Sequence, residues 1–557
     1  MSYERKPLKS PRLAGTAFRA AIAALESPIG NALRDKTLND QGFAELRREA
    51  IDAPIAPVPV LPIGTWTGTA PSLDAIVERA DRGPGFAFET VADFRQAYRE
   101  GRTDPVQVAE RLATVIGELD RHDPPMRFLI AHQRDDLLRQ AKEAKARLDR
   151  RAPLSPLDGV PVAIKDEVDM VPYPTTAGTK VHGGTPATSD ASSVARLRAA
   201  GALLFGKTNM PEIGLTPEGM NPHHGPCRNP YHPGHDTGGS SSGSAASVAA
   251  GLAPLALGAD GGGSIRIPAS HCGVVGLKPT FGRVSEHGAA PLCWSVGHIG
   301  PIGATVADTA LGYAVMAGRD PRDANTLRQP DVVVDDLREL SLKGARVGVW
   351  TPWFDDADPS VVKACRAALG MLVEAGATTV EFEAPELQRM QNAHLVTIAS
   401  EMLAGQRATL AHRRRDYSLS VRLILALAER FSAADYVHAQ RLRGLFTERF
   451  AAIYDKVDVI ATPTCALTAQ PYAKDALPYG VSDLPTLDKT MRYVRLGNFL
   501  GLPSISVPAG YDEGGMPIGL MLTGRAWQEA LLLRLAHVVE RRVERRAPTF
   551  HRRLLPA

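Results

Sequence analysis

The sequence predicts an α/β protein, with one large domain built around a central mixed, largely parallel β-sheet covered by helices, and an extension at the N-terminus. Three observations support this. The 557 residues are 44% hydrophobic and 22% charged, which provides enough apolar side chains for a large core. Short apolar runs typical of strands alternate with amphipathic helical segments. Further strand-like runs return near the end of the chain, so segments remote in sequence complete one sheet.

Residues 1–85 form the predicted extension. An amphipathic helix is expected from Leu13 to Leu25, and the proline-punctuated run IAPVPVLPIG begins at Ile55. Prolines at this spacing favour extended polyproline geometry and cannot continue a helix. We therefore expect the extension to wrap the core; a lid or a membrane-surface contact is the alternative.

The main domain is expected over residues 86–557 and opens with helices. Apolar residues recur at three- and four-residue spacing in DFRQAYREG and in PVQVAERLATVIGELDRH. The runs VPVAI (160–164) and ALLFG (202–206) indicate strands, and SSVARLRAAG between them indicates a helix. The small-residue run from Ser244 to Gly258 is too short to span a bilayer, so we interpret it as a buried core helix.

The same alternation continues through the second half of the chain. A helical region with few breakers, at about residues 386–450, is expected to form the wall of a binding site. Strands are expected at RVGVW, TTVEF, VDVIATPT and LPSISVP. A helix is expected between the first two, at SVVKACRAALGMLVEAG.

Composition excludes several classes of protein. The 64 basic and 61 acidic side chains nearly cancel, so the chain lacks the positive field that nucleic-acid binding requires. Five widely spaced cysteines without a C-x-x-C pair argue against a disulfide framework or a zinc site and favour a reducing cytoplasm. Arg19 breaks the apolar part of the N-terminus, so we expect no signal peptide. We expect no cofactor and no integral membrane segment, and leave peripheral membrane contact open.

Two motifs match patterns that their surroundings do not support. GALLFGKT, from Gly201 to Thr208, fits a phosphate-binding loop, but its Ala-Leu-Leu-Phe interior is typical of a strand. GSSSG, from Gly239 to Gly243, fits a nucleophile elbow centred on Ser241. An elbow must follow a strand, whereas a proline- and glycine-broken loop precedes this one. We interpret both as chance matches.

A serine- and glycine-dense block from Thr237 to Ser285 is the most informative stretch. Glycine/serine runs are usually flexible linkers. This run leads into ASVAAGLAPLALG, which has the composition of a buried element, and a second glycine cluster follows at once. Because linkers rarely interrupt a core, we expect tight backbone that aims N–H groups at a substrate beside Ser240 and Ser264.

Lys165 follows the apolar run VPVAI. A lone lysine at a strand end is by default a surface residue, because lysines are rarely buried. The preceding run is apolar enough to carry this one inside, where burial disfavours the charged form of an amine. A neutral amine is a competent general base. With the two serines, Lys165 therefore predicts a serine hydrolase whose base is lysine.

Over about residues 85–540, the chain resembles the amidase signature family of serine hydrolases. Within that family it is most similar to the plant-type fatty acid amide hydrolases, through its triple serine, its triple glycine and the phrase AIKDEVDMVPYPTTAGTK. The motifs behind the family resemblance are GVPVAIKDEVD, GGSSSGSAASVAAG, DGGGSIRIPA and CGVVGLKPTFGRVS.

The resemblance implies a role for each central residue. Ser264 is the nucleophile, Ser240 follows a cis peptide bond and relays the proton, and Lys165 is the base. The backbone N–H groups of Gly261, Gly262, Gly263 and Ser264 form the oxyanion hole.

The resemblance also implies supporting residues. Asp260 and Arg266 are expected to hold the loop as an ion pair, and Ser241 to donate a supporting hydrogen bond. Two positions depart from the family pattern: Ser242 stands where many members have glycine, and His271 where the residue is often apolar.

Three functions are compatible with these residues. The first is hydrolysis of N-acyl amides with an apolar, fatty acyl group. The second is hydrolysis of aryl amides, short-chain amides or carbamates by the same chemistry. The third is a glutamine-dependent amidotransferase subunit that passes ammonia to a partner enzyme. The expected partner in the first two cases is a small-molecule amide, and the resemblance leaves a homodimer open.

Overall fold

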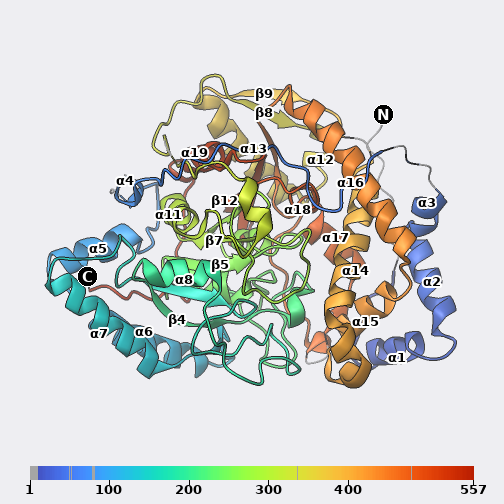
Figure 1. The fold of residues 1–557 in the computed structure, drawn as a ribbon, viewed down its shortest axis with the longest axis horizontal. Coiled ribbons are helices and arrows are strands. Elements are labelled where there is room, and N and C mark those ends of the chain that lie inside the picture. Colours follow the sequence, from blue (N-terminus) through green and yellow to red (C-terminus); the bar gives the residue numbers. More distant parts are fainter. Residues whose placement is uncertain are drawn as a thin grey trace.

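The computed structural model describes residues 10–48, 51, 53–77, 82–334, 336–384, 386–477 and 480–556. An eleven-stranded sheet of order β2-β4-β3-β5-β7-β6-β12-β13-β10-β8-β9 forms its centre (Figure 1). The α/β class and the mixed sheet are confirmed. The strands are β2 (Leu129–Ala131), β3 (Pro161–Lys165), β4 (Leu203–Thr208), β5 (Leu255–Ala259), β6 (Val275–Lys278), β7 (Ile299–Gly303), β8 (Arg346–Val349), β9 (Thr378–Glu381), β10 (Val459–Pro463), β12 (Ser504–Tyr511) and β13 (Pro517–Gly524).

The expectation that the sheet is largely parallel is wrong. Parallel pairs occur only toward its two ends, where β3 pairs with β4 and β5, and β8 with β9 and β10. From β5 through β7, β6, β12 and β13 to β10 every pair is antiparallel. Parallel neighbours need a long crossover connection, whereas β12 and β13 are joined by a short turn, which only an antiparallel pair allows.

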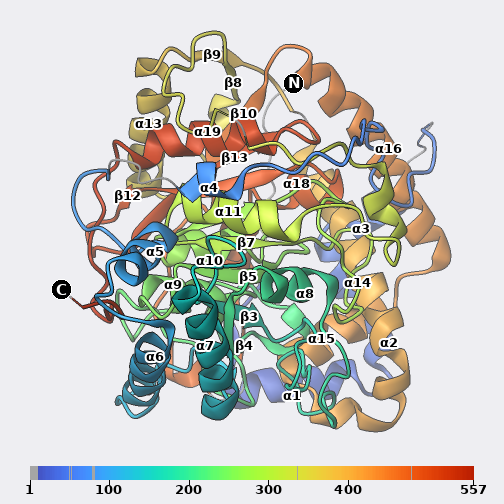
Figure 2. The same cartoon turned by 60° about the vertical axis from the view of Figure 1, so that its left-hand side comes forward.

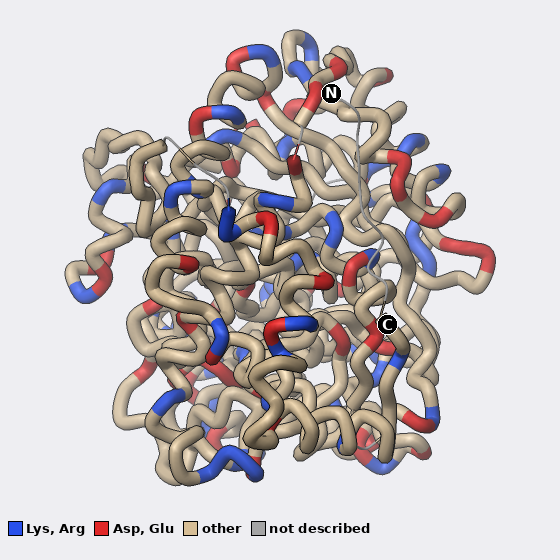
Figure 3. Tube along the Cα trace, turned by 90° about the vertical axis from the view of Figure 1, so that its right-hand side faces the viewer, with Lys and Arg blue, Asp and Glu red and all other residues tan. Residues whose placement is uncertain are grey.

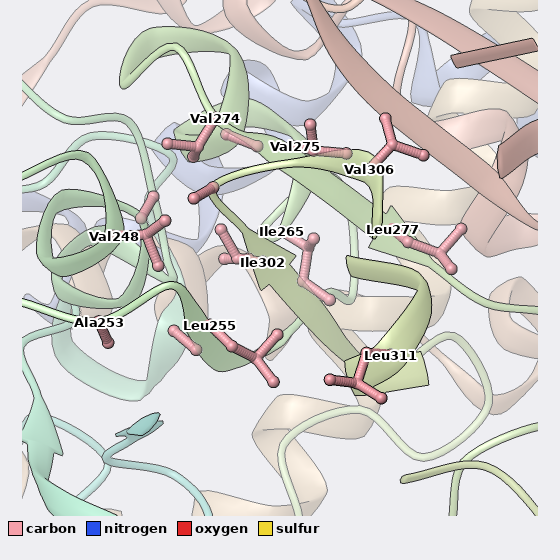
Figure 4. Close-up of a cluster of buried hydrophobic side chains, with 14 of the residues drawn as sticks. Val248, Ala253, Leu255, Ile265, Val274, Val275, Leu277, Ile302, Val306 and Leu311 are labelled. Atoms are coloured by element: carbon pink, nitrogen blue, oxygen red, sulfur yellow. The ribbon is translucent and has the colours of Figure 1, made fainter. Parts of the chain in front are cut away.

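Helices pack against the sheet along its length. Contacts join α11 to β5, β6 and β7, and α13 and α19 to β12 and β13. Figure 4 shows Leu255, Ile302 and Leu311 among the buried side chains between the central strands and α11. The helices of the main domain outside residues 386–450 are α5 (Val91–Arg99), α6 (Pro105–Asp120), α7 (Arg134–Asp149), α8 (Ser192–Ala199), α9 (Ser242–Ala249), α10 (Arg266–His271), α11 (Val306–Met316), α12 (Thr351–Phe354), α13 (Pro359–Glu374), α17 (Leu484–Met491), α18 (Arg495–Phe499) and α19 (Glu529–Glu540). Short 3₁₀ turns lie at Glu212–Gly214, Ala324–Arg328 and Lys474–Ala476, and one more lies within residues 386–450, at Arg414–Asp416.

The prediction of one buried helix from Ser244 to Gly258 is wrong. This stretch contains part of a helix followed by a strand. Helix α9 ends at Ala249, Gly251 adopts a left-handed φ of +79°, and β5 begins after Pro254. Glycine takes that backbone conformation without a steric penalty, and proline cannot continue a helix. GALLFGKT contains strand β4, whose six residues are all buried, so the structure agrees with its interpretation as a chance match.

The helical region comprises α14 (Leu387–Arg413), α15 (Leu419–Ala428) and α16 (Ala433–Tyr454). Figure 2 shows α14 and α16 side by side at one edge of the molecule. These three helices contain most of residues 386–450. Ile398 and Met402 of α14 line a cavity of the main domain.

The N-terminal extension lies against these helices (Figure 1). It contains α1 (Gly15–Leu25), α2 (Gly30–Asp40) and α3 (Phe43–Arg48), and its strand β1 (Leu13–Ala14) pairs with β11 (Val481–Ser482). Arg34 forms an ion pair with Glu429 at 2.9 Å. Residues 53–72 form no helix or strand, and α4 (Leu73–Val77), which follows them, contacts α11. Within the extension, residues 1–9, 49–50, 52 and 78–81 lie outside the described ranges.

Acidic and basic residues are mixed along the chain, as Figure 3 shows, in keeping with the formal net charge of +3. Among the described residues, no helix combines the length and the apolar character needed to cross a bilayer.

Candidate active site

Lys165 and Ser240 are in direct contact inside the domain. Lys165 is the last residue of β3, which lies between β4 and β5, so an apolar strand carries the lysine to a position where only 1% of it is exposed. Its Nζ lies 2.9 Å from Ser240 Oγ and 3.0 Å from the carbonyl oxygen of Ala259. The peptide bond between Gly239 and Ser240 is cis, as the resemblance implies.

Ser264 lines the same cavity, of about 340 Å³, as Lys165 and Ser240. It follows β5 on a loop that leads into α10. Within the described residues, Ser264 Oγ has no hydrogen-bond partner, so no direct hydrogen bond joins it to Ser240. The sequence-predicted lysine and serines therefore meet at one cavity, with one of the three possible contacts formed.

Asp260 holds the loop that carries Ser264. Its carboxylate accepts hydrogen bonds from the N–H groups of Gly263, at 2.6 Å, and Ile265, at 3.0 Å. The same carboxylate forms a buried ion pair with the Arg266 guanidinium at 2.9 Å. Burial alone would raise the pKa of Asp260, but the charge and hydrogen bonds of Arg266 outweigh it and hold this pKa well below its usual range.

Of the N–H groups that the resemblance assigns to the oxyanion hole, one is already hydrogen-bonded to Asp260 and the others are free to bind a substrate. The Gly263 N–H already has Asp260 as its partner. In the part of the chain that the structure describes, the N–H groups of Gly261, Gly262 and Ser264 donate no hydrogen bond, and all three residues line the cavity. The available donors are therefore those of Gly261, Gly262 and Ser264.

Ser241 connects the start of α9 to the end of β5. Its Oγ lies 3.1 Å from the carbonyl oxygen of Ala259 and 3.2 Å from the nitrogen of the same residue. Since Ala259 also contacts Lys165 through its carbonyl, Ser241 fixes the backbone beside the lysine. A loop precedes α9, so Ser241 does not stand on a strand-to-helix elbow.

Sequence reasoning missed Glu167. Its Oε2 lies 3.1 Å from Lys165 Nζ, and only 9% of the residue is exposed. Glu167 lies in the turn directly after β3, so strand alternation does not indicate this contact.

Asn498, on α18, was also missed. Its Nδ2 donates to the carbonyl oxygen of Asp260 at 2.8 Å, and its Oδ1 accepts from Arg266 at 2.6 Å. No local motif marks this residue, because it lies far along the chain from the loop that it supports.

Replacing Arg266 by methionine is expected to lower the free energy of unfolding by about 3–5 kcal/mol, because it leaves the Asp260 carboxylate buried and uncompensated. Urea denaturation would measure the loss. The control is Arg139→Met on α7, whose ion pair with Asp136 has a largely exposed arginine. A change of about 1 kcal/mol or less is expected there. Equal losses in the two variants would contradict the assigned contribution of the buried pair.

Apolar side chains provide most of the remaining cavity surface, namely Ile213, Leu215, Leu292, Trp294, Ile398, Met402 and Met491, and the polar residues Glu286, His287, His298, Arg322, Asp323 and Asn325 also line it. In the described ranges, no group of three or more histidine, cysteine, aspartate or glutamate side chains is arranged to hold a metal ion.

Comparison with known proteins shows the family of this chain. A family profile described as amidase matches residues 110–533, which is more than half of the chain. The chain belongs to the amidase signature family. It is an amidase that acts on linear amides.

Relatives of this amidase include hydrolases and one component of an amidotransferase. A fatty acid amide hydrolase from Medicago truncatula is 38% identical and covers 97% of this chain and 94% of that protein. A glutamyl-tRNA(Gln) amidotransferase subunit from Koribacter versatilis is 36% identical and covers 78% of this chain and 96% of that protein. The structure of a peptide amidase from Stenotrophomonas maltophilia, 30% identical, covers 83% of this chain and 98% of that chain with a TM-score of 0.71.

Proposed function

We propose that this amidase hydrolyses N-acyl amides with an apolar, fatty acyl group through an acyl-enzyme on Ser264. The observation that carries the proposal is the buried contact of 2.9 Å between Lys165 Nζ and Ser240 Oγ, beside a cavity that Ser264 also lines. A lysine in that position can take the proton of one hydroxyl while that hydroxyl takes the proton of another.

In the proposed acylation step, unprotonated Lys165 accepts the proton of Ser240 as Ser240 accepts that of Ser264. The Ser264 Oγ then attacks the amide carbonyl carbon, and the oxyanion is held by the N–H groups of Gly261, Gly262 and Ser264. The step requires the free amine of Lys165. Glu167 Oε2 lies 3.1 Å from the same Nζ and fixes the position of this amine.

In the proposed second half of the reaction, Ser240 donates its proton to the leaving nitrogen, and the carbon–nitrogen bond breaks. The amine departs, and water attacks the acyl carbon of the ester on Ser264. The products are a carboxylic acid, the amine and the regenerated serine hydroxyl. Protonation of the nitrogen is essential, because an amide anion is a very poor leaving group.

The apolar wall supports a fatty acyl group. Met402 and Leu292 belong to a buried apolar cluster that continues from the cavity between α14 and α15, where it includes Val421 and Leu425. Burying one methylene group is worth about 0.8 kcal/mol, so each added carbon of an acyl chain in contact with this wall strengthens binding. Fatty acid amide hydrolases also match nearly the whole chain.

The proposal is tested by a turnover screen over amides graded by acyl length and by amine. Purified protein alone should release amine from long-chain N-acyl amides with a higher kcat/KM than from acetyl or aryl amides. Preference for the short-chain or aryl amides would overturn the acyl assignment and leave the chemistry in place. Turnover that requires glutamine and partner proteins would favour the amidotransferase function, which the 36% identical relative from Koribacter versatilis supports over a smaller part of the chain.

Trp294→Ala is expected to lower kcat/KM for long-chain amides by about tenfold, since it removes apolar contact worth roughly 1.4 kcal/mol. Trp294 lines the cavity and remains 46% exposed, so the fold should tolerate the change. Short-chain amides should be hydrolysed as before. Trp66→Ala, in the N-terminal extension away from the cavity lining, is the matched control. An equal loss for both acyl lengths would contradict a wall specific for the chain.

A further inference from the structure

His394 contacts the loop of the proposed oxyanion hole. It lies on α14, is fully buried, and its Nε2 is 2.9 Å from the carbonyl oxygen of Gly261. A Cβ atom at Gly262 would lie 3.2 Å from His394 Cε1, so glycine there lets the ring approach closely. In the described part of the chain, His394 Nδ1 has no hydrogen-bond partner. The contact with Gly261 is therefore the only hydrogen bond found for this ring.

The direction of this hydrogen bond follows from the protonation state of His394. Burial lowers the pKa of His394 to about 3, and the nearby charge of Arg495 acts in the same direction. The ring is therefore neutral near pH 7 and carries one proton. A carbonyl oxygen can only accept, so Nε2 carries that proton and donates it to Gly261.

The peptide unit between Gly261 and Gly262 transmits this contact to the cavity. It is not among the cis bonds of the chain, and in a planar trans peptide the C=O and the N–H point in opposite directions. With the Gly261 carbonyl directed at His394, the Gly262 N–H points away from the helix. Gly262 lines the cavity, and its N–H donates no hydrogen bond in the described structure.

We propose that His394 is a positioning residue that sets the oxyanion hole by holding the Gly261 carbonyl, and so directs the Gly262 N–H at the substrate oxygen. The inference rests on the proposed acyl-enzyme function. Asp260 fixes the following part of the loop through the N–H groups of Gly263 and Ile265. The peptide unit between Gly261 and Gly262 is therefore held on both sides. The helical region 386–450 then contributes to transition-state stabilisation as well as to the wall.

The test compares His394→Leu with His394→Gln. Leucine removes the hydrogen-bond donor, so the Gly262 N–H is no longer held in one direction. We expect kcat to fall by about 10- to 100-fold, somewhat less than on loss of a whole oxyanion donor. KM should stay nearly constant, because the ground-state carbonyl does not depend on this hydrogen bond to the same extent. Glutamine places an N–H near the position of Nε2 and should restore most of kcat. A merely structural residue would not show rescue by glutamine or a split between kcat and KM.

A tetrahedral inhibitor gives an independent measurement. An alkyl trifluoromethyl ketone, which forms a tetrahedral adduct with a serine hydroxyl, should bind His394→Leu more weakly by the same factor as kcat falls. The carboxylic acid product should bind both proteins alike. Thr397→Val, on the same helix and bonded to Gln440 rather than to the loop, is the control for disturbance of α14 and should keep its kcat.

The outcomes separate this inference from the proposed function. Absence of amide turnover by the wild-type protein would overturn the function; labelling by an alkyl fluorophosphonate, whose phosphoryl oxygen enters the same hole, would then still report on His394. Unchanged kcat or labelling rate in His394→Leu would overturn the inference, and so would failure of glutamine to rescue. Should leucine prevent folding, the inhibitor affinity of His394→Gln decides, with near wild-type binding expected and a large loss contradicting the proposal.

Discussion

Replacing Ser264 by alanine is expected to lower kcat for amide hydrolysis by about 10⁶-fold, as loss of the nucleophile does in other serine hydrolases. The proposed mechanism has no second path to the acyl-enzyme, because Ser240 Oγ is engaged by Lys165. Ser264 is partly exposed at the cavity and its hydroxyl has no partner in the described structure, so thermal stability should hardly change. Amine release measured at high enzyme concentration checks the result.

Mass spectrometry of the protein after reaction with an alkyl fluorophosphonate identifies the nucleophile directly. The wild-type protein should gain one phosphonyl group on the peptide that contains Ser264, and Ser264→Ala should gain none. Ser247→Ala is the matched control, since Ser247 on α9 is buried and its hydroxyl has no partner among the described residues. Labelling that persists in Ser264→Ala would assign the nucleophile to another residue.

Lys165→Met should lower kcat by about 10⁴-fold, the upper range for removal of a general base. Methionine fills a similar volume, so the cavity keeps its shape while the proton acceptor is lost. The measurement is kcat across pH, with the folded fraction determined by circular dichroism.

Lys207→Met is the matched control for Lys165. Lys207 is a second buried lysine, on the neighbouring strand β4, and its Nζ donates to the carbonyl oxygen of Val168 at 2.6 Å. Its loss should reduce stability, since it faces Asp166, yet kcat per folded molecule should remain comparable with the wild type. Equal falls in kcat for both variants would show that any buried lysine here matters only for packing.

Sequence patterns predict those features that depend on neighbouring residues. The apolar run before Lys165 predicted a buried strand, and a long run with few helix breakers predicted the helices around residues 386–450. The block from Ser244 to Gly258 was harder, because small apolar residues fit a helix and a strand equally well. The order of strands in the sheet was out of reach, since it depends on pairings between remote segments.

The site shows the same limit. Lys165, Ser240 and Ser264 were predicted together because all three lie in the motifs that carry the family resemblance, and the structure brings them to one cavity. The residues that hold the loop come from elsewhere: Asn498 contacts Asp260, and His394 contacts Gly261, across more than a hundred residues of sequence. No spacing rule connects such positions, so only the folded chain identifies them.

The position of β6 has a consequence for how the protein is made. This strand pairs with β7 on one side and with β12, from the last part of the chain, on the other. While the ribosome is still adding the residues between them, β6 therefore presents an unpaired, apolar edge of the kind that promotes aggregation. We expect the nascent chain to depend on chaperones, and refolding after dilution from denaturant to be slow, because non-local pairing limits the rate.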